Sequence, residues 1–248
     1  MDPSITQGST TGRGAAPAPD RGEPTDADAP VVLFDMDGVI VEGRGTADAV
    51  HDRALDDVLA ARELDPDDDV RSALSGYEYT ETFVGAAEAL GVDPADLFAE
   101  RERRSARRSN ERLAAGARGV YPDVDALDRI ADHATVGLVS NNYHPTVEFV
   151  VDHFGLDAFV LARGRDLGVE GFHRRKPEPY YLNEALSALG ASDGLYVGDR
   201  RTDLLAAERA GLDGVFLRRD HNAGEDLDVP CTAKVGSLTA LIPLVADG

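Results

Sequence analysis

Five short apolar runs recur along the chain, and each is bounded by residues that favour turns. Runs of this length are typical of strands in a parallel sheet, which is covered by helices on both faces and therefore has no polar face. We expect strands at residues 31–34, 135–139, 158–161, 195–197 and 214–217.

Amphipathic stretches lie between several of these runs and stop at glycines. One begins at Pro145, a favourable residue for a first helical turn, and extends to Phe154 before Gly155. Two others cover residues 179–189 and 202–210. Alternating strands and helices predict an α/β fold, with a doubly wound, mostly parallel sheet and right-handed crossovers.

The segment 43–117 interrupts this alternation, because it has helical periodicity and no convincing strand. A helical block inserted after the first strand predicts an α-helical cap over the ligand-binding edge of the sheet. The expected division is a core of residues 31–42 and 118–248 with a cap of residues 43–117. Residues 1–29 are rich in Gly, Pro, Ser, Thr and Asp, and we expect them to form a disordered acidic tail.

Charge indicates the solution conditions that the protein is adapted to and the partners that it disfavours. The formal net charge is −21, and the acidic residues are spread along the whole chain. Because such a surface repels itself unless salt screens it, we expect adaptation to a salty, halophilic cytoplasm. The same charge disfavours nucleic acid as a general partner.

The expected location is cytoplasmic, with no membrane partner. No apolar run approaches the 18 or more residues of a membrane span, and no apolar secretory segment is visible at the start of the sequence. Cys231 is the one cysteine of the chain, which excludes an internal disulfide and suits a reducing compartment. The sequence does not indicate an oligomeric state.

Polar residues follow the predicted strands where each strand ends. Three strands are followed by the pairs Asp35 and Asp37, Ser140 and Asn141, and Asp199 and Asp203. Lys176 lies in RRKPEP, just before an amphipathic stretch, and is one of two lysines among 25 basic residues. Because the carboxyl ends of parallel strands form the binding edge of such a sheet, we expect these side chains to converge.

This set of residue types meets the needs of phosphoryl transfer. Phosphate monoesters hydrolyse very slowly unaided, so an enzyme must supply a nucleophile, a proton donor and charge neutralisation. A carboxylate can attack phosphorus and form an aspartyl-phosphate. Clustered carboxylates would repel that anion unless a hard cation such as Mg²⁺ lay between them. The expected function is a Mg²⁺-dependent phosphatase acting on a small phosphorylated metabolite.

Four motifs in order, DMDGVI, VSNN, RRKPEP and GDRRTD, make the chain resemble the haloacid dehalogenase superfamily over roughly residues 31–220. The resemblance is to the subclass with a helical cap after the first strand, similar to phosphoglycolate phosphatases and β-phosphoglucomutases. It implies a Rossmann-like core and a Mg²⁺ cofactor.

The resemblance also implies roles for the acidic residues. Asp35 would be the nucleophile and a Mg²⁺ ligand. Asp37 would be the general acid and base, with its backbone carbonyl facing the metal. Asp199 would be a further Mg²⁺ ligand, and Asp203 would hold a metal-bound water or position the lysine.

The phosphate-binding roles follow in the same way. Ser140, with Asn141 or its backbone amide, would hold phosphate oxygens. Lys176 would neutralise the phosphoryl group and the nucleophile. A compact ammonium here is not replaceable by the broad fork of arginine, although the chain uses arginine almost everywhere else.

Two other functions use the same fold. A phosphomutase of the β-phosphoglucomutase kind would need the same core acids, and a catalytically silent binding protein would need none of them. In the family, dehalogenases lack the second acid that Asp37 supplies. Phosphonatases need a cap lysine, and residues 43–117 contain none.

Two further features are interpreted as structural. Arg101, Arg104, Arg108 and Arg112 share one helical face, which indicates a solvated helix paired with neighbouring acids more than a cationic surface for anions. The six histidines show no metal-ligand spacing and are expected to be surface or core residues.

Overall fold

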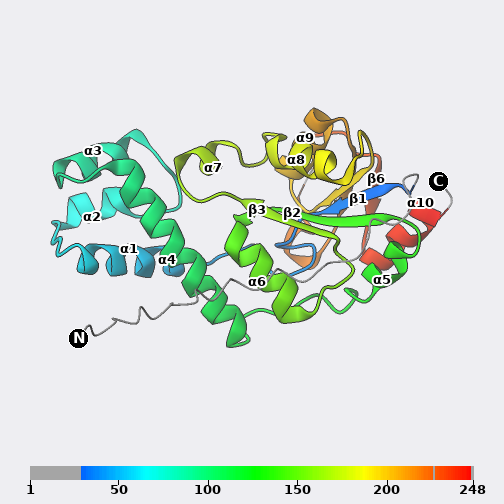
Figure 1. Ribbon diagram of the computed structural model, residues 1–248, viewed down its shortest axis with the longest axis horizontal. Coiled ribbons are helices and arrows are strands. Elements are labelled where there is room, and N and C mark those ends of the chain that lie inside the picture. Colours follow the sequence, from blue (N-terminus) through cyan, green and yellow to red (C-terminus); the bar gives the residue numbers. More distant parts are fainter. Residues whose placement is uncertain (1–28, 226, 247–248) are drawn as a thin grey trace, which may run out of the picture.

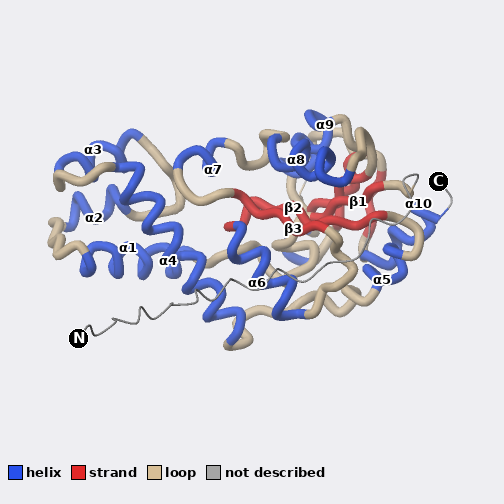
Figure 2. Tube along the Cα trace, viewed as in Figure 1, coloured by secondary structure: helices blue, strands red, loops and turns tan. Residues whose placement is uncertain are grey.

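The computed structural model describes residues 29–225 and 227–246, so the expected tail lies outside the described residues except for its last position. Six strands form one sheet in the order β3-β2-β1-β4-β5-β6, and every neighbouring pair is parallel (Figures 1 and 2). The strands are β1 (Val31–Phe34), β2 (Thr135–Tyr143), β3 (Leu161–Arg165), β4 (Leu195–Gly198), β5 (Asp213–Leu217) and β6 (Ala233–Val235). The predicted α/β fold is confirmed, and the chain changes direction across the sheet between β1 and β4.

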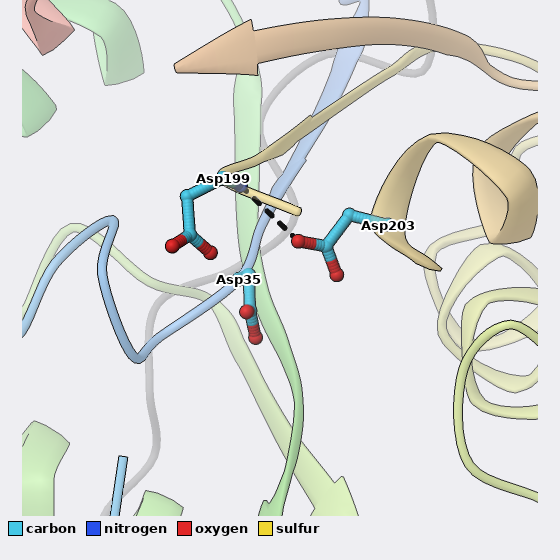
Figure 3. A group of neighbouring side chains, drawn as sticks. All are labelled: Asp35, Asp199 and Asp203. Atoms are coloured by element: carbon cyan, nitrogen blue, oxygen red, sulfur yellow. Dashed lines mark hydrogen bonds between the residues drawn. The ribbon is translucent and has the colours of Figure 1, made fainter. Parts of the chain in front are cut away.

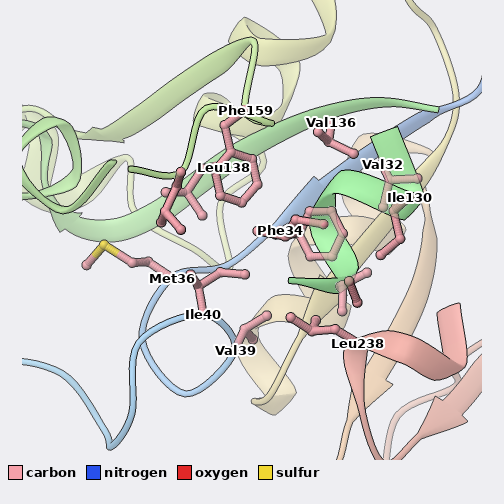
Figure 4. Packing of buried hydrophobic residues seen from close by; sticks show 14 of the residues in the cluster. Val32, Phe34, Met36, Val39, Ile40, Ile130, Val136, Leu138, Phe159 and Leu238 are labelled. Carbon is pink, nitrogen blue, oxygen red and sulfur yellow. The ribbon is translucent and has the colours of Figure 1, made fainter. Parts of the chain in front are cut away.

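Helices cover both faces of the sheet, which explains why β1 is apolar at every position. Successive side chains of a strand point to opposite faces, so Val32 and Phe34 pack on one side and Val31 and Leu33 on the other. Figure 4 shows the first of these layers. It is covered by α5 (Ala126–Ala131), α6 (His144–Phe154), η2 (Leu238–Leu241) and α10 (Ile242–Ala246), and the second by α8 (Tyr180–Leu189) and α9 (Arg201–Ala210).

Five helices lie between β1 and β2, and the first four of them form one end of the elongated molecule (Figure 1). These four are α1 (Asp48–Ala61), α2 (Asp68–Leu74), α3 (Glu81–Ala89) and α4 (Pro94–Ala114). These helices, called the helical insert below, bury their own apolar cluster, which also takes in Phe172 of the short helix α7 (Val169–His173). Side-chain caps at Asp67, Thr80 and Asp93 begin α2, α3 and α4. The boundaries of the cap at residues 43 and 117 stay a prediction.

The predicted strand at 158–161 is wrong. Phe159 of that apolar run is buried in a loop against Phe34, with ring centroids 6.0 Å apart, and β3 begins only at Leu161. The strand itself carries Arg163 and Arg165, whose charges hid it from a search for apolar runs. The short edge strand β6 was also not predicted, and β2 continues four residues beyond its predicted end.

The arginine-rich helix α4 follows the structural interpretation at Arg104 and Arg108 and departs from it at Arg101, which is buried and not solvated. Arg104 and Arg108 form ion pairs with Glu100 and Asp57. Arg101 is buried, with its guanidinium 4.9 Å from the centroid of the Phe83 ring, and it donates a hydrogen bond to a backbone carbonyl. Three of the four arginines are therefore not free to form a cationic surface. No helix within the described ranges is long and apolar enough to cross a membrane.

Candidate active site

Three buried carboxyl groups meet at the carboxyl edge of the sheet. Asp35 directly follows β1, Asp199 directly follows β4, and Asp203 lies in the first turn of α9. One oxygen of each lies within 4.8 Å of one oxygen of the others. Figure 3 shows the three side chains gathered from these three segments. The expected convergence of these acids is therefore confirmed.

Lys176 places its ammonium among these acids. Its Nζ lies 2.9 Å from Asp35 Oδ1 and 2.8 Å from Asp203 Oδ1, and it donates a hydrogen bond to the Tyr196 hydroxyl at 2.5 Å. Burial is the largest influence and lowers the pKa of Lys176, but the Asp203 and Asp35 carboxylates outweigh it and raise the pKa above its ordinary value. Lys176 is thus a charged group held next to the expected nucleophile.

Asn141 and Asp203 hold this arrangement in place. The Asn141 side chain accepts a hydrogen bond from the Lys176 backbone N–H at 2.8 Å and donates to its carbonyl at 3.1 Å. Its amide group is therefore oriented by the lysine backbone, and one N–H of the side chain stays available for another acceptor. Asp203 Oδ2 accepts from the backbone N–H groups of Asp199 and Arg200, at 3.1 and 3.0 Å.

The donor set at this edge fits a hard divalent cation. Asp35 Oδ1 and Asp199 Oδ1 are buried without a hydrogen-bond partner among the described residues. Each has only an ion-pair contact, to Lys176 at 2.9 Å and to Arg200 Nε at 3.8 Å. Burial, followed by the charges of Asp203 and Asp35, raises the pKa of Asp199 to about 8. This excess of buried negative charge is what a cation bound by oxygen ligands would relieve.

Asp37 lies beside this group and not within it. Its Oδ1 is 2.8 Å from Arg118 Nη1, and its Oδ2 accepts a hydrogen bond from Asn142 Nδ2 at 2.8 Å. Arg118 also donates to the carbonyl of Glu42, so one guanidinium contacts both Asp37 and the chain leading into the helical insert. Asp37 therefore has an environment distinct from that of Asp35, as two different roles require.

A cavity of about 600 Å³ opens over these residues. Asp35, Asp37, Ser140 and Lys176 are among the residues that line it. The helical insert contributes His51 and the loop before α3 contributes Tyr77, so the cavity lies between the core and the insert. Five of the predicted residues, the four named above and Asn141, thus line one space large enough for a small metabolite, whereas Asp199 and Asp203 do not line it.

Several site residues were given no role in the prediction, among them Tyr196, Asn142, Arg118 and His221. His221 lies in the 3-10 turn η1 (Asp220–Asn222), and its Nε2 is 2.6 Å from Asp199 Oδ2. The expectation that every histidine is a plain surface or core residue is therefore wrong for His221. Asn142 belongs to the VSNN motif and could have been found there, whereas nothing in their local sequence marks Arg118 or His221.

Comparisons with known proteins agree with this geometry. The family model of the haloacid dehalogenase-like hydrolases matches residues 29–211. A phosphoglycolate phosphatase of Rhodobacter capsulatus is 28% identical over 242 residues, which are 89% of this chain and 98% of that protein. One of Yersinia pseudotuberculosis is 30% identical over 214 residues, which are 78% of this chain and 83% of that protein.

A solved structure shares the fold. CbbY from Rhodobacter sphaeroides in complex with phosphate superposes with a TM-score of 0.59 at 20% identity, over 86% of this chain and 96% of that one. The family match, the relatives and the convergent acids lead to one conclusion. The chain belongs to the haloacid dehalogenase-like hydrolase family and is a phosphatase, an enzyme that hydrolyses phosphoric monoesters.

Proposed function

We propose that the protein is a Mg²⁺-dependent phosphatase that hydrolyses a small phosphorylated metabolite through an aspartyl-phosphate on Asp35. One observation carries the proposal: a buried ammonium, Lys176, contacts Asp35 in the lining of a cavity, beside carboxylate oxygens that have no hydrogen-bond partner among the described residues. That arrangement suits a nucleophile that must receive a negatively charged phosphoryl group.

In the first step, the Asp35 carboxylate forms a bond to phosphorus and the ester bond between phosphorus and the leaving oxygen breaks. Asp37 gives its proton to the departing alkoxide. Lys176 offsets charge on Asp35 and on the transferring oxygens, and Ser140, which lines the same cavity, donates to a phosphate oxygen. The product is an acyl phosphate on Asp35 and a free alcohol.

In the second step, water attacks phosphorus and the bond between phosphorus and the Asp35 oxygen breaks. Asp37, now a carboxylate, takes the proton of that water, so that inorganic phosphate leaves and both acids return to their first state. Asn142 and Arg118 hold Asp37 where it can serve both steps.

Asp35 and Asp199, with the backbone carbonyl of Asp37, would hold Mg²⁺, which would supply charge neutralisation at the phosphoryl group. Residues 43–117 would act as the cap that closes the cavity and selects the substrate. Because the relatives named above are phosphoglycolate phosphatases, 2-phosphoglycolate is the first substrate to test.

The test is release of inorganic phosphate from a panel of phosphomonoesters that includes 2-phosphoglycolate and sugar phosphates. We expect activity in Mg²⁺, none in EDTA, and none in Asp199→Ala, because its removal takes away a metal ligand. Asp157→Ala, at an exposed loop position, is the matched control and should keep full activity.

Two outcomes would replace the proposal. Transfer of the phosphoryl group to a second sugar hydroxyl instead of to water would indicate a phosphomutase. Absence of turnover across the panel in Mg²⁺, with a folded protein, would indicate a silent binding protein.

A further inference from the structure

A chain of hydrogen bonds runs from Tyr121 through His221 to Asp199. His221 Nε2 lies 2.6 Å from Asp199 Oδ2, and His221 Nδ1 lies 3.2 Å from the Tyr121 hydroxyl. As a metal ligand Asp199 must be a carboxylate, which only accepts hydrogen bonds, so in that state the Nε2 that faces it would carry the proton and donate it to Asp199. In that tautomer Nδ1 carries no proton and can accept the one from the Tyr121 hydroxyl.

The turn that carries His221 is fixed to the same edge of the sheet. Asn222 donates to the carbonyl of Asp199 at 2.9 Å and to the carbonyl of Leu217 at 3.0 Å. These bonds join η1 to the ends of β4 and β5. His221 therefore approaches Asp199 from an anchored position.

Gly38 lies directly against the atoms at which His221 and Asp199 meet. A side-chain carbon at Gly38 would overlap Asp199 Oδ2 and lie 3.0 Å from His221 Nε2. Gly38 also has a φ of 86°, which glycine adopts without strain. The glycine of the DMDG sequence thus leaves the space in which the histidine and the carboxylate meet.

The two oxygens of Asp199 have different surroundings. Oδ2 has His221, whereas Oδ1 is buried and has no hydrogen-bond partner among the described residues. A carboxyl group held by one oxygen cannot rotate freely, so the hydrogen bond from His221 sets where Oδ1 points. The acids that Asp199 neighbours are Asp35 and Asp203.

We propose that His221 is a positioning residue of the metal site: it holds Asp199 by Oδ2 and so presents Oδ1 to Mg²⁺ beside Asp35. Partners that orient ligands in this way commonly strengthen metal binding by ten- to a hundredfold. The inference rests on the proposed Mg²⁺ site but not on any particular substrate.

The experiment is calorimetric titration of the full-length protein with Mg²⁺ and no substrate. We expect His221→Ala to weaken Mg²⁺ affinity by about ten- to a hundredfold. His221→Gln, whose amide can still donate to Asp199, should recover part of the loss, and Tyr121→Phe should cause a smaller loss. His133→Ala, at an exposed position, is the control and should bind like the wild type. In active protein, the Mg²⁺ concentration for half-maximal rate should rise more than kcat falls.

A ¹⁵N spectrum of the imidazole gives an independent readout, in which His221 should carry its proton on Nε2. Protonation on Nδ1 alone, or an unchanged Mg²⁺ affinity in His221→Ala, would overturn the inference. If His221→Ala does not fold, wild-type affinity in both His221→Gln and Tyr121→Phe would overturn it. Mg²⁺ binding is measured without turnover, so a lack of phosphatase activity would contradict the proposed function and leave this test intact.

Discussion

Two buried groups of charged side chains in the described part of the molecule differ in their ratio of positive to negative charge. At the sheet edge, the ammonium of Lys176 lies among three carboxyl groups, and oxygens of Asp35 and Asp199 lack hydrogen-bond partners within the described ranges. Between the core and the helical insert, Arg165 of β3 forms a buried ion pair with Glu102 of α4. There, one positive charge meets one negative charge.

The pair between core and insert is also fully hydrogen-bonded. Both terminal nitrogens of Arg165 donate to Glu102, and the Gly168 N–H donates to Glu102 Oε2 at 2.6 Å. The Arg165 guanidinium also lies 4.7 Å from the centroid of the Tyr143 ring, which lines the cavity. The balanced pair fastens two parts of the protein, whereas the unbalanced group leaves atoms available for a ligand. Excess buried charge is thus a better sign of a site than buried charge alone.

The largest effect should come from Asp35→Asn, which removes the nucleophile of the unbalanced group. We expect turnover to fall by about 10³-fold or more, with no loss of stability, because one of three crowded acids is gone. Mass spectrometry of quenched protein after exposure to acetyl phosphate should show one phosphoryl group on the wild-type peptide containing Asp35 and none in the variant.

Asp37→Asn is the matched comparison within the same motif. It should slow turnover by about 10²–10⁴-fold but still allow Asp35 to be labelled by the activated donor. Label on Asp37, or full turnover by Asp35→Asn, would refute the assignment of the two acids.

Glu102→Gln should reduce stability, whereas Asp35→Asn should reduce turnover. It leaves Arg165 buried without its counter-charge, so we expect the free energy of unfolding to fall by about 3–5 kcal/mol. Urea denaturation measures this loss. The control is Glu111→Gln in the exposed pair with Arg107, which should cost at most about 0.5 kcal/mol. Equal losses in the two variants would remove the distinction between the buried pair and a surface pair.

A change in stability of intermediate size is expected at His51, which lines the cavity near the ion pair of Arg165 and Glu102. Burial, and then the charge of Arg101, lowers the pKa of His51 to about 4, although Asp48 and Asp52 oppose this and Arg165 adds to it. Between pH 6.5 and 4 the unfolded chain therefore binds a proton that the folded chain refuses, and stability falls as the pH falls.

His51→Gln should remove this contribution while keeping a side-chain group for Ser105, which contacts His51 Nδ1. Between pH 7 and pH 5 the wild type should lose about 2 kcal/mol more than the variant in urea denaturation. His133→Gln, at an exposed position, should behave like the wild type. Identical pH dependence in His51→Gln would contradict the lowered pKa.

The smallest effect should come from salt. A net charge of −21 repels itself at low ionic strength, so the melting temperature should rise from dilute buffer to molar KCl. The stability cost of Glu102→Gln should change little over the same range, because a buried pair is poorly screened. A flat or falling melting temperature would remove the halophile interpretation.

The sequence predicted the parts of the site that depend on strand ends. Asp35 and Asp199 come directly after short apolar runs, and parallel strands bring their carboxyl ends together whatever the intervening loops do. Lys176 was predicted from its place in the RRKPEP motif before a helix, and its rarity among many arginines, a property of this chain and not of its fold, supported the prediction.

The remaining site residues depend on segments that meet only in three dimensions. Arg118 reaches Asp37 because the chain returns from the insert at that point, and His221 reaches Asp199 because η1 folds over the sheet edge. The pairing of Arg165 with Glu102 also joins segments that are distant in the sequence. The charge of Arg165 concealed strand β3, and the pair as a whole concealed the interface between the core and the insert. Hydrophobic periodicity gives no information about such contacts.

The scarcity of lysine gives the buried ammonium a practical use. Lys176 and Lys234 carry the two side-chain amines of the protein, and Lys234 is exposed on β6 while Lys176 is only 4% exposed. An amine-directed reagent should therefore modify Lys234 readily and Lys176 much more slowly, because little of the Lys176 side chain is exposed. At a fixed pH, the ratio of the two labels therefore follows both the opening of the reaction centre and the release of Lys176 from its carboxylates, without substrate, and the many arginines do not react with the reagent.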